Sequence, residues 1–188
     1  MHRDLMRLPA RHSRTGLLNV IVETPRGSRN KYRYDEELGL FLLHKRLPAG
    51  AAFPFDFGFV PATRAEDGDP LDVVVLADEA TMAGCLTTVR LLGVLEAEQT
   101  EKGETLRNDR LVGVAETEKI HPEITSLDQV PPREIEQIEH FFVSYNRYEG
   151  REFVIVGRGG PKVAWKLVES GMRSYQTSGN HAARSRDA

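Results

Sequence analysis

The segment Glu66-Asp67-Gly68-Asp69-Pro70-Leu71-Asp72-Val73-Val74-Val75 places three aspartates directly before an apolar run of strand character. Pro70 favours an extended conformation of Asp69, and Gly68 permits a close turn of the backbone. Alternate side chains of an extended chain share a face, so we expect Asp67 and Asp69 to point to one side. Asp72 begins the strand, and its side chain can turn back towards Asp67 and Asp69. Solvation alone gives no reason for these carboxylates, and they predict a site for a metal ion and phosphate.

Magnesium suits this spacing, because it prefers oxygen ligands and usually joins one or two carboxylates to waters and substrate phosphates. A calcium loop of the EF-hand type is excluded. That motif needs glycine at its sixth position and glutamate at its twelfth, where this chain has Asp72 and Asp78. An acidic turn before a strand remains the alternative.

The composition is that of one globular domain. The chain has 188 residues, of which 40% are hydrophobic and 7% aromatic. Its 28 acidic and 25 basic residues give a net charge of −3, which predicts no general affinity for nucleic acid or acidic membranes. Cys85 is the only cysteine, so we expect a reducing, cytoplasmic environment without disulfides. No apolar stretch is long enough to span a membrane, and residues 1–16 lack the apolar centre of a signal peptide.

Short strand-like runs separated by turns fill the chain from Asn19 to Glu116. They cover 19–24, 31–35, 40–44, 57–60, 71–77, 86–96 and 110–116. Many short strands without intervening helices predict a closed or nearly closed antiparallel barrel. Apolar residues at helical spacing predict a helix after Pro132 and another around 164–175, with a strand at 153–156 between them. We expect residues 1–16 to form a flexible arm, 17–178 a single barrel domain and 179–188 a frayed tail.

Basic residues gather between Glu23 and Arg33, in a loop that joins two predicted strands. Lys31 and Arg33 lie two apart on a strand, so their side chains share a face that could bind an anion. A solvated basic face is the alternative. The aromatic run at 53–61 is, by itself, more typical of core and turns than of a binding site.

Taken in order, three segments resemble the soluble family I inorganic pyrophosphatases. They are Glu23-x-Pro25 with Gly27-Ser28-x-x-Lys31-Tyr32, the aromatic segment at 53–58, and Asp67-Gly68-Asp69-Pro70-x-Asp72. The resemblance implies a mainly β protein, with a five-stranded barrel of the oligonucleotide-binding type flanked by two helices. It also implies hydrolysis of pyrophosphate to two phosphates with Mg²⁺, Mn²⁺ being possible, in a homo-oligomer that is commonly a hexamer.

The resemblance assigns roles to individual positions. Asp69 matches the carboxylate that activates the attacking water, and the metal-binding acids are matched by Glu23, Asp67 and Asp72. Lys31 and Tyr145 match groups that hold phosphate. This chemistry needs a hydroxide near neutral pH and neutralised phosphate charge, which metal ions supply, and otherwise depends on positioning and electrostatics.

Several positions depart from the family pattern, and they converge on the expected site. Arg33 stands where the family has an acid, Lys45 where it has arginine, and Asn146 where a lysine is usual. Phe53 and Phe57 replace two tyrosines.

The largest departure lies between residues 95 and 114, where the family usually carries two further metal-binding aspartates and a lysine. Our alignment places Gln99 and Asn108 at the aspartates and Arg110 at the lysine, across a longer loop. Glu98 and Asp109 are alternatives one residue out of register, but that shift would point them to the other face of a strand.

These exchanges make the site more positive, so we expect fewer metal ions, with Asn108 as a weak ligand. Basic side chains then neutralise phosphate in place of metal. The expected phosphate contacts are Lys31, Arg33, Lys45, Arg110 and Tyr145. A hydrolase for another phosphoanhydride or phosphate ester, and a non-catalytic phosphate or nucleotide binder, remain as alternatives.

Overall fold

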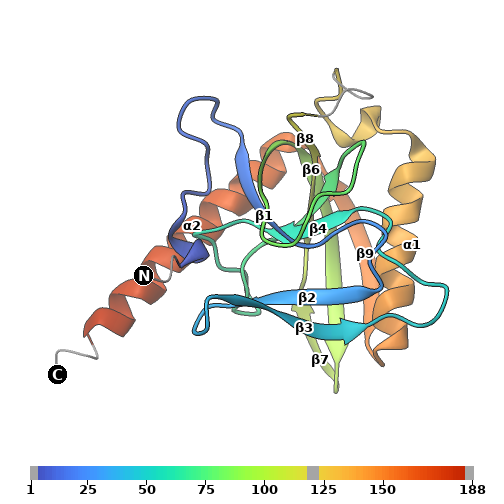
Figure 1. Ribbon diagram of the computed structural model, residues 1–188, viewed down its shortest axis with the longest axis horizontal. Helices are drawn as coiled ribbons and strands as arrows, with labels where there is room; N and C mark the ends of the chain where they lie inside the picture. Colours follow the sequence, from blue (N-terminus) through green and yellow to red (C-terminus); the bar gives the residue numbers. More distant parts are fainter. Residues whose placement is uncertain (1–3, 118–122, 185–188) are drawn as a thin grey trace.

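The computed structural model describes residues 4–117 and 123–184, with side chains up to residue 178. Most of the regular structure is β, and the two long helices lie in the C-terminal part of the chain, with β9 between them (Figure 1). In chain order the elements are η1 (Leu5–Arg7), β1 (Leu18–Thr24), β2 (Asn30–Asp35), β3 (Leu40–Arg46), β4 (Asp56–Phe59), β5 (Asp72–Leu76), β6 (Leu86–Glu101), β7 (Glu104–Arg107), β8 (Arg110–Ala115), η2 (Leu127–Gln129), α1 (Pro132–Tyr148), β9 (Glu152–Gly159) and α2 (Pro161–Arg184).

Five strands close on themselves in the order β1-β4-β5-β8-β6, because β6 also pairs with β1. The predicted five-stranded barrel with two helices is therefore confirmed. The prediction of purely antiparallel pairing is wrong at one place, since β5 and β8 run parallel. Parallel neighbours need a long crossover, and β6 with β7 provides it between them.

The hairpin of β2 and β3 forms a separate two-stranded sheet beside the barrel (Figure 1). Its turn spans residues 36–39, between two strands that the sequence predicts. The Leu38 N–H donates to the Asp35 carboxylate, and the Gly39 N–H donates to the Asp35 carbonyl, with Gly39 at φ 64°. Lys31 and Lys45 stand opposite each other on this hairpin, which brings together two basic side chains far apart in sequence.

The segment expected as a long loop after residue 96 is a strand hairpin instead. β6 continues to Glu101, and the chain turns at Lys102 and Gly103, whose φ angles are 53° and 84°. Two successive positive φ values are typical of the tight turns that match strand twist. The strands were missed because residues 98–107 are mostly polar and show no apolar alternation.

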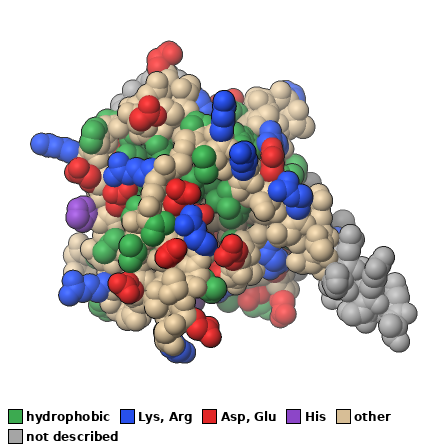
Figure 2. Space-filling view, turned by 180° about the vertical axis from the view of Figure 1, so that it is seen from behind, with side chains coloured by type: hydrophobic (Ala, Val, Ile, Leu, Met, Phe, Trp, Pro, Cys, Tyr) green, Lys and Arg blue, Asp and Glu red, His purple; other side chains and the backbone are tan. Residues whose placement is uncertain are grey.

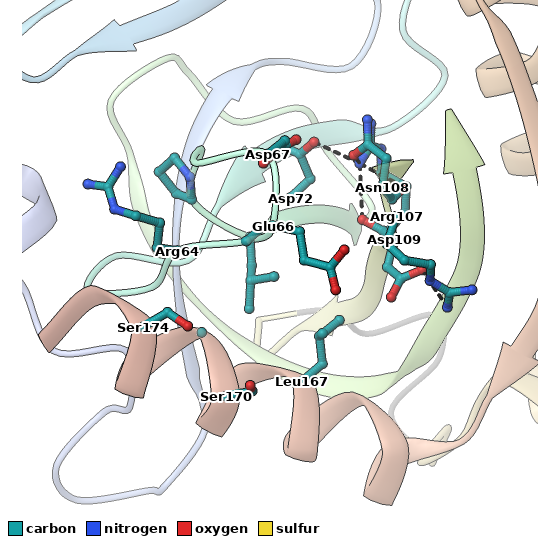
Figure 3. Close-up of a pocket in the computed structure, with 15 residues that line it drawn as sticks. Arg64, Glu66, Asp67, Asp72, Arg107, Asn108, Asp109, Leu167, Ser170 and Ser174 are labelled. Atoms are coloured by element: carbon teal, nitrogen blue, oxygen red, sulfur yellow. Dashed lines mark hydrogen bonds and ion pairs between the residues drawn. The ribbon is translucent and has the colours of Figure 1, made fainter. Parts of the chain in front are cut away.

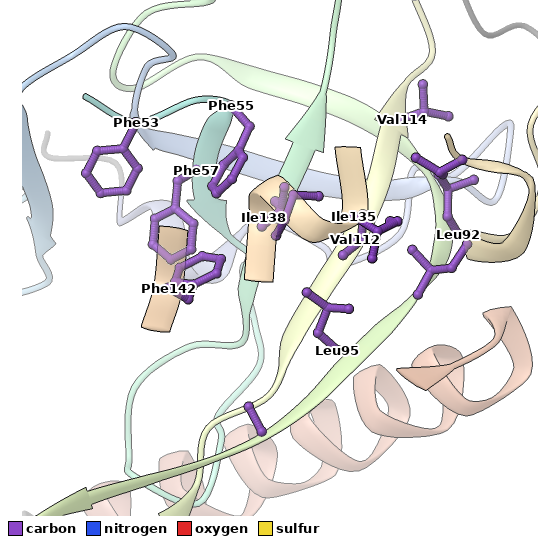
Figure 4. Packing of buried hydrophobic residues seen from close by; sticks show 14 of the residues in the cluster. Phe53, Phe55, Phe57, Leu92, Leu95, Val112, Val114, Ile135, Ile138 and Phe142 are labelled. Carbon is purple, nitrogen blue, oxygen red and sulfur yellow. The ribbon is translucent and has the colours of Figure 1, made fainter. Parts of the chain in front are cut away.

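Aromatic side chains fill the core between the barrel and α1 (Figure 4). Ile135, Ile138 and Phe142 recur at helical spacing on α1 and are buried. Phe142 packs against Phe55 and Phe57 with tilted rings, whose centroids lie 5.6 and 5.7 Å from its own. This packing fixes α1 against the barrel and places Tyr145, one turn further on, near the basic hairpin.

A second core lies between α2 and the barrel, where Ala164 and Val168 contact the cluster containing Leu71 and Val73. No helix in the described part of the chain is long and apolar enough to cross a membrane. On the face seen in Figure 2, acidic and basic side chains lie beside one another rather than in separate patches.

Residues 4–16 and the last turns of α2, up to residue 184, differ from the flexible arm and frayed tail that we expected. Met6 and Ala10 are 0% and 1% exposed, and the Asn19 side chain donates to the Pro9 carbonyl at 2.8 Å. The prediction of a loose arm is therefore wrong for this packed part, because apolar residues at spaced positions anchor it. α2 extends to Arg184, so the expected fraying at 179 does not apply to the backbone up to that residue. The domain boundaries themselves stay a prediction.

Substitution of Gly58 tests the closeness of β1 and β4. A Cβ on Gly58 would lie 2.1 Å from the Ile21 carbonyl oxygen, and backbone cannot move aside cheaply. We expect Gly58→Ala to lower the free energy of unfolding by about 1–3 kcal/mol, the usual cost of overpacking. Gly160→Ala is the control, because nothing lies within 4 Å of the added atom. Equal urea midpoints for the two variants would contradict the prediction.

Candidate active site

The acidic segment forms a closed loop at the start of β5. Ala65 N–H donates to the Asp69 carbonyl at 2.7 Å, and Gly68 has φ 87°, so the chain reverses here instead of running extended. The expectation that Asp67 and Asp69 share a side is wrong for this reason. Asp69 lines a large cavity, Asp67 lines two smaller ones, and Asp72 lines both the large cavity and one of the small ones.

The large cavity, about 800 Å³, lies between the β2–β3 hairpin and the acidic loop. It collects most of the predicted site residues, which are Glu23, Lys31, Arg33, Lys45, Asp69 and Asp72. The electrostatic effect of its basic residues is reflected in the pKa of His44. Partial burial lowers the pKa of that imidazole, and the charges of Lys31, Lys45 and Arg33 lower it further. The effect of these three cations therefore exceeds that of Glu149, which raises the pKa of His44, while Asp35, Glu36 and Glu37 also line the cavity.

Arg33 binds the loop directly, with its guanidinium 2.5 Å from the Asp69 Oδ1. Both side chains are about half exposed. The residue that replaces a family acid thus pairs with the predicted general base. One Asp69 oxygen is engaged by the pair, and the second stays available to accept a proton.

Lys45 pairs with Glu149 at the C-terminal end of α1. Arg151 lies 3.8 Å from the same carboxylate and also lines the large cavity. Sequence reasoning missed both Glu149 and Arg151. Their only signal was a charged pair around Gly150, directly after the predicted helix. Lys45 therefore lines the cavity while it is ion-paired with Glu149.

Arg64 was also missed, although it stands just before the acidic loop. Its guanidinium donates to the Gly68 carbonyl and lies 3.7 Å from Glu36 in the hairpin turn. It thereby joins the two walls of the large cavity.

The smaller cavity of about 180 Å³ lies between the acidic loop, the start of β8 and α2 (Figure 3). Asp67 and Asp72 point into the space beside Asn108 and Asp109 in this view. Arg110, the predicted phosphate contact, is only 6% exposed and lies 2.9 Å from the Asp72 Oδ2. It is therefore turned to protein oxygens, and its contact with phosphate stays a prediction.

The two amides predicted at aspartate positions bind each other. Asn108 Nδ2 donates to Gln99 Oε1 at 3.0 Å, and both line one cavity with Asp67. Asp109 instead accepts from the Ala97 N–H and pairs with Arg107 at 2.9 Å. This arrangement agrees with the amide alignment rather than with the alternative one residue out of register.

Three of the residues that depart from the family pattern, Phe53, Phe57 and Asn146, are buried in the packing of the core. Phe53 and Phe57 are 1% and 2% exposed, and Asn146 is 2% exposed and donates to the Phe142 carbonyl. None of the three presents a polar group to the large cavity. Tyr145 stacks on Phe141, with ring planes at 11°, and the Lys31 ammonium lies 5.2 Å from its ring centroid.

Burial and mutual repulsion alter the protonation of the site. Desolvation raises the pKa of Tyr145 to about 12, so its phenol stays protonated and can donate. Desolvation also raises the pKa of Asp67, with the Asp72 and Asp69 carboxylates adding to the effect. Burial lowers the pKa of Lys31, while Asp72 and Glu23 oppose that shift and Arg110 adds to it.

Glu23 gives a testable pH dependence. Burial raises its pKa from 4.5 to about 7, partly offset by the hydrogen bond from the Tyr34 N–H. The folded state therefore keeps the Glu23 proton up to a higher pH than the unfolded state does. The stabilisation that comes from this proton is complete below pH 4.5 and is lost as the pH rises to about 7. Glu23→Gln cannot ionise, so we expect the variant to gain stability relative to the wild type across that window. Urea unfolding in chelator at several pH values measures it, and a pH-independent difference would refute it.

The oxygen donors present suit a divalent cation at Asp67 and Asp72, because such an ion completes its shell with waters and phosphate. The described residues contain no group of three or more acidic, histidine or cysteine side chains arranged as a metal cluster.

A barrel that holds a basic hairpin over an acidic loop, with a wide cavity between them, defines a protein that handles phosphate anions. Comparison with known proteins gives the family. A model of the family described as inorganic pyrophosphatase matches residues 20–176. An inorganic pyrophosphatase of Nostoc sp. is 35% identical over 173 residues, which are 92% of this chain and 99% of the relative.

Solved structures agree. The inorganic pyrophosphatase from Thermus thermophilus matches with a TM-score of 0.83 at 33% identity, covering 93% of this chain and 99% of that one. The enzyme from Neisseria gonorrhoeae matches with a TM-score of 0.82 at 28% identity, covering 92% and 99%. The chain belongs to the inorganic pyrophosphatase family, which confirms the resemblance.

Proposed function

We propose that the chain hydrolyses inorganic pyrophosphate to two phosphates in the large cavity, with a divalent cation that is Mg²⁺ or Mn²⁺. The observation that carries the proposal is the convergence of Lys31, Arg33 and Lys45 opposite Asp69 and Asp72 in one cavity. Phosphoryl transfer needs little more from a protein than positioning and charge stabilisation, which these three cations supply.

Each side chain has a separate task in this proposal. Lys31 and Arg33 hold phosphate oxygens, and Tyr145 donates from a phenol that stays protonated. Lys45 contacts the anion while Glu149 keeps its ammonium oriented. Asp69 accepts the proton of the attacking water through the oxygen that Arg33 does not engage.

Asp67 and Asp72 would hold the cation, with Glu23 and Asn108 nearby. When bound, the ion supplies a nucleophilic hydroxide near neutral pH and neutralises phosphate charge. The protein's part is to fix the two carboxylates, through the Ala65 to Asp69 hydrogen bond and the Arg64 contact with Gly68.

Phosphate release from pyrophosphate tests the proposal, with Mg²⁺ and with chelator in parallel. We expect turnover that requires the cation. A panel with a nucleoside triphosphate and a phosphate monoester distinguishes hydrolysis of another phosphoanhydride or ester. Binding of pyrophosphate without turnover of any substrate would identify a non-catalytic phosphate binder and would sink the hydrolase proposal.

The assembly and the compartment are further parts of the proposal. Family membership supports a homo-oligomer, with a hexamer as the expected form, which sedimentation equilibrium would test. Cys85 is a free thiol, which suits a reducing cytoplasm.

A further inference from the structure

Four protein oxygens surround a single nitrogen of Arg110. Its Nη1 contacts Asp72 Oδ2 at 2.9 Å, the Asn108 carbonyl at 3.2 Å and the Asp109 carbonyl at 3.0 Å, and it also contacts Asn108 Oδ1. A guanidinium Nη carries only two protons, so these acceptors outnumber its hydrogens. Carboxylate, amide and carbonyl oxygens gathered around one point are the donor set that a hard cation selects.

Aromatic rings also surround the Arg110 guanidinium. The guanidinium carbon lies 5.2 Å from the ring centroid of Phe142, 5.4 Å from Phe153 and 6.0 Å from Phe57. The buried Nε has no hydrogen-bond acceptor among the described residues. Arginine cannot lose its proton in proteins, so the position is permanently positive. Aromatic faces stabilise that charge without supplying a competing anion.

We propose that the Arg110 guanidinium is the resident cation of this oxygen cluster and excludes a divalent ion from the space between Asp72 and Asn108. Asp67, with the remaining oxygen of Asp72, then binds a single divalent ion. The identity of that ion rests on the proposed function. With Arg110 as a fixed positive charge, the carboxylates of the site need only one divalent ion to balance their charge.

The neighbouring contacts support this assignment. The Asn108 amide is shared between Arg110 and Gln99, so its oxygen is not free for a metal. A neutral amide beside a fixed cation avoids an unpaired carboxylate, whereas a second ion at this point would repel the guanidinium at close range.

Counting bound Mn²⁺ tests the proposal, because oxygen ligands accept Mn²⁺ as well as Mg²⁺. Equilibrium dialysis of the full chain, with free Mn²⁺ followed by electron paramagnetic resonance, needs no turnover. We expect one ion per wild-type chain, and two in the double variant Arg110→Gln/Asn108→Asp, which removes the guanidinium and adds a carboxylate. Arg110→Lys keeps the charge and is the matched control, expected to stay at one.

Two or more ions in the wild type would overturn the proposal, even if the double variant did not fold by circular dichroism. A folded double variant that binds no more Mn²⁺ than the wild type would also overturn it. A wild-type count of zero with a gain of one in the double variant would support the role of Arg110. That result would instead contradict the metal-assisted hydrolysis proposed above.

Discussion

Asp69→Asn is expected to lower the turnover of pyrophosphate by about 10²–10⁴-fold, the usual contribution of a positioned general base. The amide keeps the size of the side chain and can still accept a hydrogen bond from Arg33 through its oxygen. It cannot take a proton from water near neutral pH. Initial rates of phosphate release at saturating pyrophosphate measure the change, so the expected loss is in kcat.

Glu66→Gln is the matched control, because it makes the same change of charge in the same loop. Glu66 lines the small cavity beside α2. We expect it to retain turnover within a few-fold of the wild type, and both variants to bind phosphate by calorimetry. Full turnover of Asp69→Asn would place the base elsewhere. Equal losses in the two variants would show that the loop's charge matters rather than the Asp69 carboxylate.

The barrel and the helices could be predicted because they follow from local patterns. β1, β5 and β8 carry nearly continuous apolar runs, and α1 carries apolar residues at helical spacing. Local patterns failed where the chain is polar. β7 has no apolar alternation, and the acidic loop is a turn because its hydrogen bonds close it, which Pro70 alone does not reveal.

The ion pairs of the site could not be predicted, since each joins segments that only the fold brings together. Arg33 meets Asp69, Lys45 meets Glu149, and Arg110 meets Asp72 across neighbouring strands. Sequence reasoning counted the added positive charges as a property of the site. It could not see that Arg33, Lys45 and Arg110 each already pair with a protein carboxylate before any phosphate arrives.

Because these cations are already paired, a phosphate must displace a carboxylate in order to bind them. A phosphate entering the large cavity competes with Asp69 for Arg33 and with Glu149 for Lys45. The Arg33–Asp69 pair is about half exposed, so its separation costs little, whereas Lys45 and Glu149 are only 26% and 15% exposed and their separation costs more. The pair of Arg110 and Asp72 is more buried, and it therefore contributes to the fold as well as to the charge of the site.

Asp72→Asn is accordingly expected to destabilise the protein by about 3 kcal/mol, near the lower end for breaking a buried pair. The Arg110 side chain is 7% exposed and Asp72 is 28% exposed, so the remaining guanidinium would stay buried without its counter-charge. Urea unfolding in chelator measures the loss without any contribution from metal. Asp67→Asn is the control. Asp67 has no ion pair among the described residues, and its pKa is raised by burial, so this change should leave stability unaltered or slightly improved.

The double variant Asp72→Asn/Arg110→Gln separates the lost pair from the lost side chain. If the single change is costly because a charge is left alone, removing that charge as well should recover about 1–2 kcal/mol, a coupling expected for residues in contact. Additive losses would mean that the two residues act independently, and Arg110 would then be held by the aromatic rings and carbonyls alone. A coupling of the expected size would show that one ion pair both stabilises the barrel and sets the charge at the metal-binding end of β5.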